Sequence, residues 1–143
     1  MAYRLHLLWA FVFRPHTEGV WVAVWCENKL LVIRNAYRRR LTLPGGGIDR
    51  GEAFEVAAAR ELREEVALDV APEELSFVGQ YHSDVEYKHD TINLYALELP
   101  TEPSLAIDRR EVVYAEFVDP YTLTDVEAFP ALCEYVAHRR ASA

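Results

Sequence analysis

One continuous stretch near the middle of the chain limits the possible folds more than any other. Residues 53–66 read AFEVAAARELREEV, which is rich in alanine, leucine, glutamate and arginine and contains neither glycine nor proline. These residue types favour helix, so the stretch predicts a helix of about four turns. The segment before it, LPGGGIDRGE at 43–52, contains three successive glycines, which suit close backbone approach to a ligand rather than helix. The chain therefore has to place a helix directly after a glycine-rich loop.

Strand-like stretches lie on both sides of this helix. Residues 19–26 are rich in β-branched and aromatic side chains, and after a turn at 27–29 the sequence LLVIR resumes, which predicts a hairpin. Three more strand-like stretches follow, near 75–82, 91–99 and 111–118. A final helix is predicted over 129–140, with Pro130 in its first turn. Strands that flank a central helix, with a second helix at the end, indicate a mixed α/β sandwich.

Composition indicates one domain and limits its partners. The 143 residues, 51% of them hydrophobic, suffice for a single core, and no repeat or linker divides the sequence, so one domain is expected over 1–143. The formal net charge of -8 argues against a surface that holds long nucleic acid. Cys26 and Cys133 lie far apart without CxxC spacing, which indicates neither a disulfide framework nor a zinc site. We therefore expect a reduced, cytoplasmic protein.

An apolar N-terminal element occupies residues 1–15. Its apolar run, 5–13, is too short to span a bilayer and ends without a small-residue cleavage site, so we interpret it as a packed element and expect no membrane partner. Leu8, Trp9 and Phe13 could cover a partner subunit. The element therefore suggests a homodimer.

Acidic residues gather on one side of the predicted central helix. Glu61, Glu64 and Glu65 are spaced i, i+3 and i+4, so their side chains fall within roughly 100° of arc. Like charges at this spacing repel, and Mg²⁺ is commonly held by carboxylates together with waters and substrate phosphates. The stripe therefore predicts a Mg²⁺ site, with Mn²⁺ as a substitute. The alternative is that these glutamates only solvate the helix, with Arg60 and Arg63 in local ion pairs.

The spacing of the fixed residues around this helix resembles the signature of the Nudix hydrolases. Gly46 is followed after five residues by Glu52, and after seven more by RELREE, which is similar to the family box GX5EX7REUXEEXGU, where U is a bulky aliphatic residue. The box covers 46–68, and the resemblance reaches most of 17–122. Ala67 stands where the family has glycine. An alanine in the left-handed conformation common at that helix end would cost on the order of 1 kcal/mol.

The resemblance implies a Nudix-type α/β/α sandwich with a mixed β-sheet and a loop-helix-loop catalytic motif. It also implies Mg²⁺-dependent hydrolysis of a phosphoanhydride bond in a nucleoside di- or triphosphate derivative, such as a nucleoside diphosphate linked to another group. The expected partner is then a small nucleotide-like diphosphate substrate. A different class remains open: a non-catalytic Nudix-like module that binds a nucleotide and regulates a partner. The intact glutamate set favours catalysis.

The resemblance also assigns roles to residues of the box. It implies that the divalent ion is held by Glu61, Glu64, Glu65 and the carbonyl of Gly45. Glu52 would support the site, and Arg60 would orient a glutamate through an ion pair rather than touch the substrate. Together these are the expected catalytic residues.

Two further groups of site residues are expected outside the helix. Some members of the family take an additional ligand or base from a later strand, for which Glu116 is the first candidate here, followed by Glu111 and Glu86. The substrate-binding candidates lie around the glycine-rich loop: Arg38, Arg39, Arg40, Gly46 and Gly47. The three arginines could pair with the outer phosphates, although a solvated turn explains them equally well.

Overall fold

The computed structural model describes residues 16–84 and 89–143, so the apolar N-terminal element and Glu86 lie outside the described residues. Its sheet has six strands: β1 (His16–Cys26), β2 (Lys29–Asn35), β3 (Gly45–Gly47), β4 (Ser76–Ser83), β5 (His89–Leu99) and β6 (Val112–Val118). Its helices are α2 (Phe54–Val66) and α3 (Pro130–Ser142), with single 3-10 turns η1 (Pro72–Glu74) and η3 (Pro120–Thr122). Both predicted helices and the predicted strands are therefore present, with ends shifted by one or two residues except at β1, which begins three residues earlier than expected.

The sheet is mixed, in the order β4-β5-β1-β2-β6, with β3 paired to β1 outside this path. Strands β1 and β5 run parallel over their whole length, from His16 beside His89 to Cys26 beside Leu99. The other pairings are antiparallel. The predicted hairpin is confirmed, since Cys26 pairs with Lys29 across a turn at Glu27 and Asn28. Strand β3 was expected to be part of a loop.

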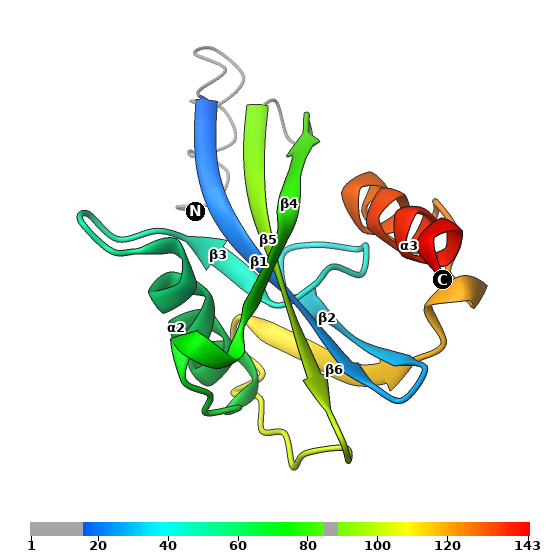
Figure 1. Ribbon diagram of the computed structural model, residues 1–143, viewed down its shortest axis with the longest axis horizontal. Helices are drawn as coiled ribbons and strands as arrows, with labels where there is room; N and C mark the ends of the chain where they lie inside the picture. The colour runs from blue at the N-terminus through cyan, green and yellow to red at the C-terminus, as the bar shows by residue number, and fades with distance from the viewer. Residues whose placement is uncertain (1–15, 85–88) are drawn as a thin grey trace.

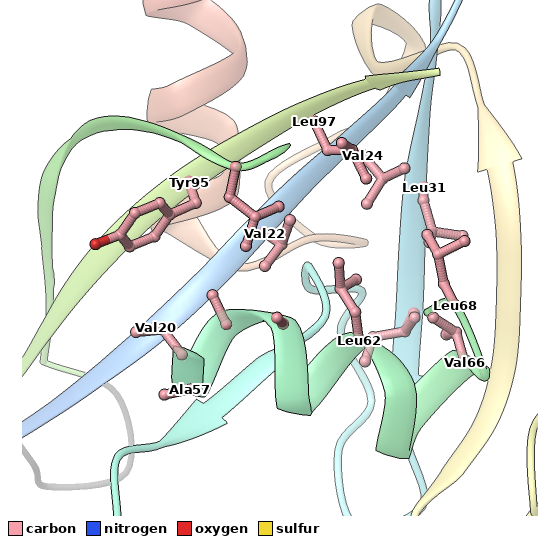
Figure 2. Close-up of a cluster of buried hydrophobic side chains, with 14 of the residues drawn as sticks. Val20, Val22, Val24, Leu31, Ala57, Leu62, Val66, Leu68, Tyr95 and Leu97 are labelled. Atoms are coloured by element: carbon pink, nitrogen blue, oxygen red, sulfur yellow. The ribbon is translucent and has the colours of Figure 1, made fainter. Parts of the chain in front are cut away.

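One helix covers each face of the sheet, as Figure 1 shows with α2 and α3 on opposite sides of the strands. Alternate residues of β1 point to opposite faces, so each face has its own core. Val20, Val22 and Val24 pack in the cluster that contains Leu62 of α2. Figure 2 shows these side chains meeting between α2 and the sheet.

The second core lies between the sheet and α3. It contains Ala23 and Trp25 of β1 together with Leu132 and Tyr135 of α3. The indole N–H of Trp25 donates to the hydroxyl of Tyr135 at 2.8 Å, which satisfies a polar group that would otherwise be buried alone. The α/β/α arrangement expected from the sequence is thus confirmed. In the part of the chain that the structure describes, no helix is long and apolar enough to cross a membrane.

Candidate active site

The glycine strand β3 lies with its backbone pressed between β1 and α2. A Cβ on Gly45 would lie 2.7 Å from Cδ1 of Trp21, and closer still to the backbone of β1. A Cβ on Gly46 would lie 2.6 Å from Oε1 of Glu61, whereas one on Gly47 would meet no atom within 4 Å. The first two glycines are therefore required by close approach, one to β1 and the other to a carboxylate of α2.

Helix α2 ends where its alanine replaces the family's glycine. Ala67 has φ 59 and ψ 30, the left-handed conformation that favours glycine. Its N–H bonds to the carbonyl of Arg63 at 3.1 Å, and the N–H of Leu68 bonds to the carbonyl of Leu62 at 3.3 Å. These contacts satisfy carbonyls at the helix end. The helix exit keeps the shape that glycine would give, at the energetic cost of an alanine.

The three glutamates of the predicted metal site differ in their surroundings. Glu65 is buried, with 8% of its surface exposed, and its Oε1 accepts a 2.6 Å hydrogen bond from the N–H of Gly45. The side chain of Glu61 is 13% exposed, and that of Glu64 is 55% exposed. Two of the three carboxylates are therefore largely removed from water, and one faces solvent.

Arg60 connects the carboxylates of this region. Its guanidinium forms two 2.8 Å hydrogen bonds with the carboxylate of Glu52, in a bidentate arrangement. Nη1 also donates to Glu61 at 2.9 Å and to Glu64 at 3.3 Å, while Nη2 donates to the carbonyl of Gly47 at 3.0 Å. Nε also lies 3.5 Å from Oδ2 of Asp49, so one cation contacts four acidic side chains and the end of β3. This geometry suits the orienting role expected for Arg60.

The buried acidic side chains have too little positive charge around them to offset their burial. Burial raises the pKa of Glu65 to about 8, although the hydrogen bond from the Gly45 N–H works against the shift. Burial also raises the pKa of Glu61, against the influence of Arg60. Glu52 is the opposite case: its hydrogen bonds with Arg60 lower its pKa to about 2. Arg60 therefore strongly favours the ionised form of Glu52 and offsets the burial of Glu61 only in part.

The carboxylate oxygens of this cluster are chemically suited to bind a divalent cation. Glu61 and Glu65 are oxygen donors whose ionised forms are disfavoured by burial and by neighbouring negative charges, including that of Glu61 on Glu65, and a hard cation supplies the missing counter-charge. Within residues 16–84 and 89–143, however, no three or more acidic, histidine or cysteine side chains are already gathered around one point. Glu61 and Glu64 turn towards Arg60, and Glu65 turns towards the N–H of Gly45.

The expectation that Glu116 joins this cluster is wrong, because β6 points it to the other face of the sheet. Glu116 pairs with Val32, and Val32 belongs to the core beneath α3. The hydroxyl of Tyr114, which packs against the same core, donates to the Glu116 carboxylate. By contrast, the neighbouring Phe117 packs in the core beneath α2. Alternation along a strand therefore separates Glu116 from the α2 glutamates.

The structure brings Glu111 towards the cluster instead. The negative charge of Glu111 contributes to the raised pKa values of both Glu61 and Glu65, although burial is the larger cause. Two hydrogen bonds fix the backbone of Glu111 before β6. Its N–H donates to the Asp108 carboxylate at 3.3 Å, and its carbonyl accepts from the N–H of Ala36 at 2.8 Å. Sequence spacing could not rank Glu111 above Glu116 without the register of β6.

A cleft of about 290 Å³ lies on the other side of the glycine strand. Gly45, Gly46 and Gly47 line one wall, and Trp21 and Phe129 are among the aromatic residues that line the rest. The glycine strand therefore lies between the cleft and the acidic cluster, with no side chain of its own in the way. Of the two features beside the glycine strand, the cleft rather than the acidic cluster has the shape of a small-molecule site.

Of the three arginines before the glycine strand, Arg38 is the one that reaches this cleft. Its guanidinium carbon lies 5.0 Å from the centre of the Phe129 ring and 5.3 Å from that of Tyr37, within range of cation–π contact. Arg39 and Arg40 are exposed and are not among the described residues that line the cleft. Arg38 therefore stays a candidate for substrate binding, and the solvated-turn interpretation suits the other two.

A mixed sheet between two helices, with a glycine strand separating a cleft from an acidic helix, defines a Nudix-type fold. Residues 15–134 match the NUDIX domain family. The chain therefore belongs to the Nudix hydrolase family, as its signature box indicates, and the resemblance is confirmed.

Individual relatives agree with this assignment. A "MutT-like protein" from Streptomyces ambofaciens is 34% identical over 83 residues, which are 58% of this chain and 49% of the relative, so the chain spans about half the length of that curated relative. The MutT protein of Methanosarcina mazei Go1 is similar in structure, with a TM-score of 0.73 and 19% identity over 89% of this chain and 94% of that one.

The NUDIX domain of Shewanella oneidensis NrtR, solved with ADP ribose, gives a TM-score of 0.73 and 18% identity over 92% of each chain. At this level of identity the two structures support the fold alone.

Proposed function

We propose that this protein is a Mg²⁺-dependent pyrophosphohydrolase that cleaves a phosphoanhydride bond in a nucleoside di- or triphosphate derivative. The position of β3 carries the proposal, because its glycines line the cleft and also contact the carboxylates of α2. A diphosphate in the cleft would lie beside the acidic cluster with only backbone between them. The Shewanella domain bound to ADP ribose and a similar Ap4A hydrolase from C. elegans support nucleotide-derived substrates.

The residues of the cluster would have different roles in hydrolysis. Glu61, Glu64 and Glu65, with the carbonyl of Gly45, would hold Mg²⁺ or Mn²⁺, which when bound neutralises charge on phosphate oxygens and acidifies water. Arg60 would keep Glu61 in place through its ion pair, while its bidentate contact ties the helix to Glu52.

The reaction also needs a proton acceptor and a place for the phosphates. A water oxygen forms a new bond to phosphorus as the bridging P–O bond breaks, and the proton of that water passes to a carboxylate. A glutamate of the cluster or Glu111 would accept it, because Glu111 is close enough to influence Glu61 and Glu65. Gly46 and Gly47 would present backbone to the phosphates, and Arg38 would contact the substrate from the cleft.

Turnover of a nucleotide panel tests the proposal. The panel contains nucleoside triphosphates, sugar nucleotides, ADP-ribose and dinucleoside polyphosphates, assayed with Mg²⁺ or with a chelator, and phosphate and pyrophosphate are measured separately. We expect Glu61→Gln and Glu64→Gln to lower kcat by orders of magnitude while the protein stays folded. Glu73→Gln, an exposed glutamate in η1, is the matched control and should keep the wild-type rate.

Two outcomes would contradict the proposal. Full activity of both Gln variants would show that these carboxylates do not act in catalysis. Tight nucleotide binding without turnover of any panel member would instead indicate the regulatory module that the sequence leaves open. A single-domain organisation, a cytoplasmic location and a homodimer stay predictions.

A further inference from the structure

A buried amide on β5 holds an exposed carboxylate at the cleft. Asn93 is 1% exposed, and its Nδ2 donates to Oε1 of Glu18 at 3.1 Å and to the carbonyl of Gly19 at 3.2 Å. Its Oδ1 accepts from Nε2 of Gln80 at 2.9 Å. The Gln80 contact fixes which end of the Asn93 amide faces Glu18, so the two amides form one directed chain that ends at the Glu18 carboxylate.

The sheet register places Glu18 next to the glycine strand, among the residues that line the same cleft. On β1, Glu18 precedes Gly19, and Gly19 pairs with Gly47 of β3. Both Glu18 and Gly47 line the cleft. Asn93 pairs with Val20 on one side and with Gln80 on the other, so β1, β5 and β4 all contribute to holding Glu18. The carboxylate is thus supported by the sheet rather than by a mobile loop.

An exposed glutamate side chain is well hydrated and does not need such hydrogen bonds to be stable at the surface. Burying an amide is unfavourable unless its hydrogen bonds are made, and Asn93 directs one of those bonds to the side chain of Glu18, a residue that lines the cleft. An acceptor held in one orientation binds a donor with less loss of side-chain entropy. The negative charge of Glu18 disfavours another phosphate here and favours an uncharged hydrogen-bond donor.

We propose that Glu18 is a specificity-determining residue that accepts a hydrogen bond from a neutral donor of the substrate, either a sugar hydroxyl or a base amino group, and that Asn93 positions it. The inference rests on the proposed function and extends it. The diphosphate would lie at the glycine strand and the nucleoside part near Glu18. The cleft would then select nucleosides that carry this donor over analogues that lack it.

Binding measurements on matched nucleotides test this inference independently of turnover. The probes are ATP and ADP-ribose, each compared with its 2′-deoxy form, which lacks a sugar hydroxyl, and with its hypoxanthine form, which lacks the base amino group. In one of these pairs we expect the wild type to prefer the parent by about tenfold in Kd, the value of one hydrogen bond to a charged group. Glu18→Gln should reduce that preference by weakening binding of the parent, because a neutral amide oxygen is a poorer acceptor than a carboxylate, while binding of the analogue stays the same.

The role of Asn93 needs a readout that simple destabilisation would not give. Asn93→Leu should weaken binding of the parent as Glu18→Gln does, and the double variant should bind no more weakly than Glu18→Gln alone, because both changes remove one interaction. If Asn93→Leu does not fold, Gln80→Leu removes the bond that orients the amide and should weaken binding by about two- to threefold. Glu102→Gln, which removes a charge near Lys29, is the matched control.

Three results would overturn the inference. The first is a Glu18→Gln protein that binds every nucleotide as the wild type does, and the second is a wild type that shows no preference in either pair. The third is a lower kcat together with a higher Mg²⁺ requirement in Glu18→Gln, which would place Glu18 at the metal. Failure of the proposed function looks different: Glu61→Gln would keep full hydrolysis while the Glu18 binding data stand.

Discussion

Replacing Gly46 by alanine tests whether the glycine strand positions the carboxylates proposed to act in catalysis. The new Cβ would lie 2.6 Å from Oε1, 2.8 Å from Cδ and 3.0 Å from Oε2 of Glu61. Ordinary contact begins at 3.4 Å, so the carboxylate must move by 3.4 minus 2.6, or about 0.8 Å. The obstructing atoms are the end of a flexible side chain, so the backbone of β3 can stay in place.

The displacement should reduce catalysis far more than stability. A misplacement near 1 Å in an active site can lower the rate by about 100-fold. The 2.9 Å contact between Arg60 and Glu61 would also be lost or lengthened, which costs about 1 kcal/mol of folding free energy. We therefore expect Gly46→Ala to show a kcat about 100-fold lower, a higher Mg²⁺ concentration for half-maximal activity, and a melting temperature only a few degrees lower.

Gly47→Ala is the matched control for the strand, because its Cβ would meet no atom within 4 Å. It should keep the wild-type melting temperature and Mg²⁺ requirement, whatever its KM becomes, since Gly47 lines the cleft. Wild-type kcat and Mg²⁺ requirement in Gly46→Ala would refute the reasoning. An equal rise of the Mg²⁺ requirement in Gly47→Ala would refute it as well.

Three other predictions follow from the same contacts. Gly45→Ala should unfold the protein or leave it too unstable to purify, because the Cβ would collide with the backbone of β1 beside Trp21; a cooperative wild-type melting curve would contradict this. Ala67→Gly should raise the free energy of unfolding by about 0.5–1 kcal/mol in denaturant titration, without changing kcat, because glycine relieves the left-handed strain. The pKa of Glu65, raised from 4.5 to about 8, means that the folded state binds a proton more tightly than the unfolded state. Metal-free stability should therefore fall as the pH rises from about 4.5 to about 8, and Glu65→Gln should flatten that slope in thermal melts.

Local patterns were enough to predict the helices and most strands. The alanine- and glutamate-rich stretch forms α2 at Phe54–Val66, and the polar turn between two apolar runs closes the β1–β2 hairpin. Both features depend on residues close together in the chain, where propensity and periodicity act directly. The helix exit is a different case: only the family resemblance, with glycine at this position, pointed to a left-handed residue there, and Ala67 adopts that conformation.

Those local patterns could not predict which strands pair across long stretches of the chain. Three glycines suggest a loop, yet they form β3, because the missing side chains let this backbone approach β1 and α2. The parallel pairing of β1 with β5 joins segments about seventy residues apart, and no local signal encodes it. The choice between Glu111 and Glu116 depends on the register of β6, which decides the face on which each side chain lies.

The contacts of Arg60 indicate which carboxylates could respond to a cation. Its bond to Glu52 is bidentate, with both distances at 2.8 Å, and the pKa of about 2 keeps Glu52 charged at any pH near neutrality. Its bonds to Glu61 and Glu64 are single and longer, at 2.9 Å and 3.3 Å. A divalent cation competing for these acids would therefore take Glu64 and Glu61 before Glu52. Arg60 can thus keep its contact with Glu52 while Glu61 and Glu64 exchange their contacts with Arg60 for contacts with a cation. The proposed metal site requires this exchange.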